Sequence, residues 1–178
     1  MKHFKTIFAF MLMAVLSIGQ VWGADVTYKL TIDASDFNTT SYAANNNEKT
    51  SNAVCTTDNT KTYEVKWTSN QVMKSGNNMQ WQKSKGYIYN STNLGTITNV
   101  TVTSSAGTFT TYYGTSEQPS SGTTVGNGYF QTEVGSATGT TSKIEVTFTI
   151  SESGGGGTTN PTLFVEPLFL RAFLVILD

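Results

Sequence analysis

Apolar and polar residues alternate with a period of two along most of the chain after residue 24. The clearest runs are residues 26–33, 62–68 and 142–150, where apolar side chains occupy every second position. Such alternation predicts strands that bury one face and leave the other in water. Shorter runs predict six more strands, at about residues 71–74, 79–83, 86–90, 96–103, 108–114 and 128–134.

The segments between these runs are rich in Asn, Gly and Ser, which favour turns. The stretch 41–51 comes nearest to a helical pattern, but its three adjacent Asn residues favour a loop. About nine strands at this spacing predict an all-β fold, an antiparallel β-sandwich similar to a jelly roll, over residues 24–150.

The first 23 residues have a different pattern from the rest. Lys2 and Lys5 precede an apolar run of about ten residues, and small residues follow it. This order is typical of a secretory signal peptide. We expect cleavage between Gly23 and Ala24, and hence a secreted or cell-surface protein with no stable membrane span after cleavage, because spanning takes about 20 apolar residues.

The C-terminal part also differs in composition. Residues 151–160 are rich in Gly, Ser and Thr, as in a flexible linker. Residues 161–178 begin like the first strand of another domain and continue into an apolar run that is too short to span a bilayer. Two interpretations stay open. The segment is either the truncated start of a second domain or a tail that folds back on the sandwich as a strand or helix.

The charged side chains limit the classes of function. Signal cleavage would remove two of the 11 basic residues and leave nine against 12 acidic ones, so we expect no nucleic-acid partner. Cleavage would also remove the only histidine, His3, and with it every His-dependent catalytic relay or metal site. A hydrolase that uses carboxylates such as Asp36, Glu64 or Glu133 is the remaining enzymatic alternative. The single cysteine, Cys55, has no partner for an internal disulfide and is expected to be a small buried residue.

A resemblance to known proteins begins at residues 85–103, which read Lys-Gly-Tyr-Ile-Tyr-Asn-Ser-Thr-Asn-Leu-Gly-Thr-Ile-Thr-Asn-Val-Thr-Val-Thr. It continues through 107–119, 125–130 and 142–150. The chain over 26–150 resembles the Thr/Ser-rich β-sandwich modules of secreted and surface proteins of the Bacteroidota type. The resemblance implies an accessory module of carbohydrate-binding-like architecture, followed in longer proteins by an immunoglobulin-like domain. It carries over no active-site residue.

Aromatic side chains on the outer face would form a binding site for a polysaccharide or surface glycan, because sugar rings stack on them and nearby amides bond the hydroxyls. Trp67 shares its face with Tyr63 and Val65 and is expected in the core. If Ile88 is buried, its two neighbouring tyrosines face outward. The candidate ligand-binding residues are Trp81, Tyr87, Tyr89, Tyr112, Gln80, Gln82 and Asn90. The alternative is ordinary aromatic packing across strands.

No cofactor is expected; the less favoured alternative is a structural calcium at the segment Asp33–Asn38, whose two carboxylates lie near a strand end. The preferred hypothesis is therefore a secreted, non-catalytic module that binds carbohydrate or another surface ligand. The alternative is a structural or adhesive spacer without a small-molecule ligand. The sequence leaves the oligomeric state open.

Overall fold

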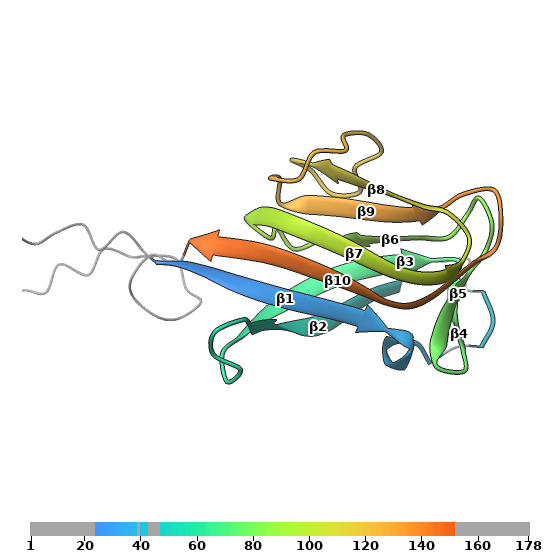
Figure 1. Cartoon of the computed structure of the whole chain (residues 1–178), viewed down its shortest axis with the longest axis horizontal. Coiled ribbons are helices and arrows are strands. Elements are labelled where there is room, and N and C mark those ends of the chain that lie inside the picture. Colours follow the sequence, from blue (N-terminus) through green and yellow to red (C-terminus); the bar gives the residue numbers. More distant parts are fainter. Residues whose placement is uncertain (1–23, 39, 43–46, 152–178) are drawn as a thin grey trace, which may run out of the picture.

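The computed structural model describes residues 24–38, 40–42 and 47–151 (Figure 1). In these residues the fold is all-β, with one short 3₁₀ helix, η1 (Ala34–Asp36). The ten strands are β1 (Asp25–Asp33), β2 (Asn47–Cys55), β3 (Thr62–Asn70), β4 (Val72–Ser75), β5 (Asn78–Trp81), β6 (Tyr87–Asn90), β7 (Thr96–Ala106), β8 (Phe109–Gly114), β9 (Tyr129–Val134) and β10 (Gly139–Ser151).

All ten strands belong to one antiparallel sheet. The order is β4-β5-β10-β1-β2-β3-β6-β9-β8, and β7 pairs with β10 outside this path. The two ends of the described domain meet in the sheet, because β1 pairs with β10 from Asp25 opposite Ser151 to Asp33 opposite Lys143. The predicted all-β antiparallel class is confirmed. The predicted division into the two sheets of a jelly-roll sandwich is not confirmed, since the strands form one large open sheet.

The core lies on one face of this sheet, as the alternation of apolar residues requires. Trp67 is fully buried, as predicted, and so are Tyr28 and Phe148, whose rings stack 5.8 Å apart across β1 and β10. The ring of Trp81 on β5 packs edge-on against Phe109 on β8, with centroids 5.2 Å apart. Side chains from opposite ends of the sheet order therefore share the core.

The prediction of a loop over residues 41–51 is wrong in its second half, because β2 begins at Asn47 and pairs with β3 along its length. Two polar residues of β2, Lys49 and Ser51, have partners within the fold. Ser51 accepts a hydrogen bond from the indole N–H of Trp67 (3.0 Å), and the ammonium group of Lys49 lies 4.9 Å from the ring centre of Phe37. These contacts stabilise a strand that has few apolar side chains.

The predicted signal peptide, residues 1–23, lies outside the described residues. So do the predicted tail, residues 161–178, and the predicted linker 151–160 except for Ser151. The described residues contain no helix that is long and apolar enough to cross a membrane.

Candidate functional site

Two tyrosines of β6 point to the outer face of the sheet. Ile88 between them is fully buried in the core, so Tyr87 and Tyr89 turn the other way and are partly exposed. Their ring centres lie 6.1 Å apart. The sequence-based orientation of this strand is confirmed.

The neighbouring strands β9 and β8 extend this patch. In the sheet register Tyr87 lies opposite Glu133, and Gln131 lies between Tyr89 and Tyr112. The hydroxyl of Tyr112 donates a hydrogen bond to Glu133 (3.1 Å), and the amide nitrogen of Gln131 donates to the other oxygen of the same carboxylate (3.4 Å). We call these five residues the tyrosine face.

The Glu133 carboxylate also changes the acidity of its neighbour. Because the Tyr112 hydroxyl donates to this carboxylate, and because a phenolate would be repelled by it, the pKa of Tyr112 is raised above its usual value. Tyr112 therefore stays a neutral hydrogen-bond donor, and its bond keeps the carboxylate in place beside the rings.

A pocket of about 510 Å³ adjoins the tyrosine face where β3 ends and β6 begins. Tyr87 and Glu133 belong to both the face and the pocket. Asn70 and Lys85 add an amide and an ammonium group to the lining. Tyr87 faces Asn70 across the β3–β6 pair, so an aromatic ring stands between an amide and a carboxylate.

One polar atom of the face lacks a hydrogen-bond partner. Among the described residues, the amide oxygen of Gln131 is buried and accepts no hydrogen bond, and the residue as a whole is 5% exposed. An unpaired buried acceptor costs about 1–3 kcal/mol. The fold therefore has an unsatisfied acceptor beneath the two tyrosines, Tyr89 and Tyr112, that flank Gln131 in the sheet.

The structure does not bring Trp81 to this face, and the expectation that its ring faces solvent is wrong. The side chain is fully buried, and its indole N–H donates to the hydroxyl of Thr141 (2.9 Å). The parity of β5 explains this position, because Met79 and Trp81 share the core face. Gln80 points to the opposite side of β5, opposite Thr140 of β10, and so lies on another part of the sheet from Tyr87.

Asn90 and Gln82 have other places in the fold. Asn90 is completely buried and bonds backbone groups only, so it does not belong to the exposed patch. Gln82 is partly exposed just before β6, where its backbone carbonyl accepts the N–H groups of Lys85 and Gly86. Of the seven predicted residues, the structure brings together Tyr87, Tyr89 and Tyr112.

The sequence analysis did not assign Gln131, Asn70 or Lys85 to the site, and it considered Glu133 only as a catalytic carboxylate. The alternation in residues 128–134 already places Gln131 and Glu133 on the face opposite Phe130. What the sequence lacks is the pairing of β6 with β9, which joins strands about 40 residues apart.

The carboxylates considered for catalysis and calcium are dispersed. Among the described residues that line the pocket, Glu133 supplies the single carboxyl group, while Glu64 is exposed on β3. Asp33 and Asp36 form a capping box around η1, in which Asp33 accepts the N–H of Ser35 (2.7 Å) and Asp36 accepts that of Asp33 (2.9 Å). The described part of the chain contains no group of three or more His, Cys, Asp or Glu side chains placed to hold a metal.

Comparisons of the chain with protein-family models, with curated proteins and with solved structures each found no match. The described residues form an all-β, antiparallel sheet domain.

Proposed function

We propose that the protein binds carbohydrate on the tyrosine face and in the pocket beside it. The observation that carries this proposal is the arrangement of Tyr87 between Asn70 and Glu133, at the mouth of a pocket of about 510 Å³. Aromatic rings stack on the C–H face of a sugar, and amide and carboxylate groups bond its hydroxyls.

The polar groups of the site suit a ligand with many hydroxyls. Glu133 is already oriented by two donors, Tyr112 and Gln131. A neutral, hydroxyl-rich ligand also requires no cluster of cations, and Lys85 is the only cation among the described residues that line the pocket.

The module acts by binding and not by catalysis in this proposal. It is exported through its predicted signal peptide and works in a secreted or surface-bound protein, as its resemblance to sandwich-like accessory modules implies. The pocket supplies one carboxylate, whereas glycoside hydrolysis of the common kind uses two. The chain after residue 23 also contains no histidine that could act in place of a second carboxylate.

Retention on immobilised polysaccharides tests the proposal. Wild type, Tyr87→Ala and the control Tyr42→Ala are passed over xylan, mannan, chitin and mucin glycans. Tyr42 is a partly buried tyrosine that lies outside the sheet. We expect wild type and Tyr42→Ala to be retained on at least one polysaccharide, and Tyr87→Ala to lose at least about tenfold in affinity, equivalent to about 1.4 kcal/mol.

Two results would contradict this assignment. Retention that Tyr87→Ala leaves unchanged would exclude the tyrosine face as the binding surface. Absence of retention on every polysaccharide would favour the spacer function. Far-ultraviolet circular dichroism of each variant checks that the fold is kept.

A further inference from the structure

Three of the described strands have only one described neighbour each: β4, β8 and β7. Two of them are short or covered. β4 has four residues and carries the charged Lys74, which discourages pairing with another chain. On β8 the N–H of Tyr113 donates to the carbonyl of Gly122 (2.8 Å), so the loop that follows the strand covers part of its outer edge.

β7 differs from both in length and exposure. It has 11 residues, and most of their side chains are exposed. At its start Ile97 exchanges backbone hydrogen bonds with Gly126 and Asn127. Beyond Ile97, no backbone group in the described ranges bonds to the outer edge of this strand. Among the residues that the structure describes, the backbone groups of this edge therefore have no strand partner beyond Ile97.

The composition of β7 also lacks the usual protection of an edge. Its sequence, Thr-Ile-Thr-Asn-Val-Thr-Val-Thr-Ser-Ser-Ala, has no charged residue and no proline. Proteins normally guard long edge strands with such residues, and an unguarded edge is a template for pairing. Val100 and Val102 are only half-buried against the core, so an added strand would also cover apolar surface.

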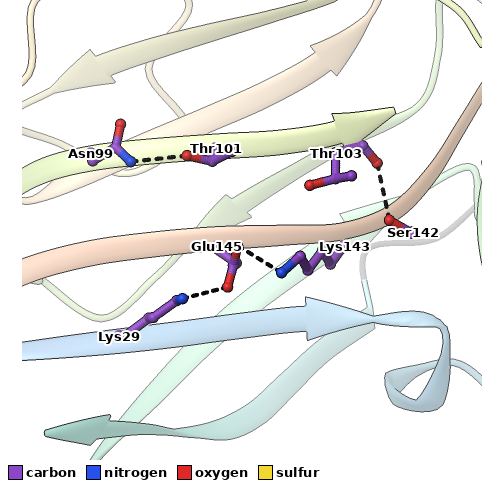
Figure 2. Close-up of polar contacts among 7 residues, drawn as sticks. All are labelled: Lys29, Asn99, Thr101, Thr103, Ser142, Lys143 and Glu145. Carbon is purple, nitrogen blue, oxygen red and sulfur yellow. Dashed lines mark hydrogen bonds and ion pairs between the residues drawn. The ribbon is translucent and has the colours of Figure 1, made fainter. Parts of the chain in front are cut away.

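The charged side chains on the neighbouring strand β10 take part in ion pairs, with one carboxylate between two ammonium groups. Glu145 on β10 is paired with Lys143 (2.9 Å) and with Lys29 of β1 (2.5 Å), as Figure 2 shows. On β7 itself, Asn99 donates a hydrogen bond to Thr101 within the strand (2.9 Å). If two copies met edge to edge, their β10 strands would be about 14 Å apart. This distance exceeds the screening length of about 8–10 Å, so salt would largely screen repulsion between the β10 charges of the two copies.

We infer that β7 is a dimerisation edge, at which two copies of this chain pair their β7 strands antiparallel about a two-fold axis at Thr101. In this register Thr101 of one copy lies opposite Thr101 of the other, and Val100 lies opposite Val102. The valines of both copies therefore lie on the same face of the joined sheet, the face that covers the core. Pairs of β-branched residues stabilise neighbouring strands, and identical uncharged strands meet without repulsion. Because the contact has two-fold symmetry, it uses the same edge of both copies and ends at a dimer.

Analytical ultracentrifugation of the protein produced from the full sequence, from micromolar to several hundred micromolar, tests this inference. We expect the mass to double as concentration rises. Thr101→Lys places two like charges opposite each other at the axis and should give a monomer at every concentration. Thr31→Lys makes the same change on the exposed side of β1 and should dimerise like wild type.

Mixing charge variants fixes the position of the axis. Thr101→Asp alone should also be monomeric, whereas an equimolar mixture of Thr101→Asp and Thr101→Lys should restore the dimer mass. A wild-type protein that is monomeric at all concentrations overturns the inference. It does so even if the β7 amides resist hydrogen exchange, because another segment of the same chain would then cover the edge. A dimer that survives Thr101→Lys overturns it as well. Circular dichroism confirms that each variant is folded, and glycan retention is measured separately.

Discussion

The side chain of Asn90 joins two segments that are distant in sequence, residues 90–92 and 128–130. Its amide nitrogen donates hydrogen bonds to the carbonyls of Thr92 (2.7 Å) and Gly128 (2.8 Å), and its carbonyl oxygen accepts the N–H of Phe130 (2.7 Å). The residue is fully buried, so water cannot replace these bonds. Asn90 thus fixes the end of β6 against the start of β9, the two strands that carry most of the tyrosine face.

Replacing this residue should cost far more stability than replacing an exposed asparagine. Asn90→Ala leaves the N–H of Phe130 and the carbonyl of Gly128 unpaired in the interior, and we expect the free energy of unfolding to fall by about 2–4 kcal/mol. Asn93→Ala is the control, because Asn93 is exposed and accepts one bond, from the N–H of Gly95 (2.8 Å). Urea unfolding measures both, and equal losses would contradict the role given to Asn90.

At this scale the sequence predicts which way a side chain points better than what it contacts. The parity of β6 correctly places Ile88 inside and Tyr87 and Tyr89 outside. Sequence proximity, in contrast, wrongly groups Trp81 with them, because β5 and β6 lie in different parts of the sheet. Asn90 shares the parity of Ile88, and a polar residue at such a position indicates a buried hydrogen-bonding role rather than an exposed one.

Among the elements, β10 connects more of the sheet than any other described strand. It pairs with β1 over nine residues, with β7 on its other side, and with β5 near its start. Its outer face carries Glu145, whose carboxylate bridges Lys143 on the same strand and Lys29 on β1 (Figure 2). These contacts make the β1–β10 pair sensitive to pH.

The hydrogen bonds from Lys29 and Lys143 lower the pKa of Glu145 below its usual value of 4.5. A carboxyl whose pKa is lower in the folded than in the unfolded state stabilises the fold above the unfolded pKa, and this contribution disappears as the pH falls through the folded pKa. Glu145→Gln should therefore reduce stability by less than about 1 kcal/mol at neutral pH, since the pair is partly exposed.

Once the pH has fallen below the folded-state pKa of Glu145, the variant and wild type should become equally stable, because both side chains are then neutral. Urea unfolding at neutral and acidic pH measures the difference. Glu64→Gln, at an exposed position on β3, is the comparison. A deficit of Glu145→Gln that persists unchanged in acid would show that packing, and not the carboxylate charge, causes it.

The sequence predicts most strands because one face of each is apolar, and it fails where that contrast is weak. β2 has Ala53 and Cys55 as its buried residues, while its first half carries Glu48, Lys49 and Ser51. Its pairing with β3 and the bond from Trp67 to Ser51 determine the strand. Both are long-range contacts, which a local pattern does not contain.

For the whole molecule, the pattern of alternation predicts which side chains of each strand face the core, but it does not predict which strands pair with one another. Fully buried residues such as Leu30, Val65 and Ile144 would look the same in one folded-over sheet and in two facing sheets. The pairing of β10 with β5, β1 and β7 joins all the strands into a single sheet, and it depends on which edges meet. Which edges meet is determined by contacts between residues that are far apart in the sequence.

This topology predicts how stability is distributed over the molecule. Amides in strands with partners on both sides open only when a large part of the fold opens, whereas edge strands open locally. We expect hydrogen-exchange protection to be highest in β10, and at least about tenfold lower in β4 and β8, which have one paired neighbour each. Mass spectrometry of peptides from the exchanged protein measures this, after correction for intrinsic rates.

The exchange pattern also depends on concentration if β7 joins two copies of the chain. In dilute protein β7 should exchange faster than β10, because only its β10 side is bonded beyond Ile97 in the described ranges. In concentrated protein β7 should slow down while β4 and β8 stay unchanged. Protection of β8 equal to that of β10 at every concentration would mean that opening is global, and that the order of strands in the sheet does not control local stability.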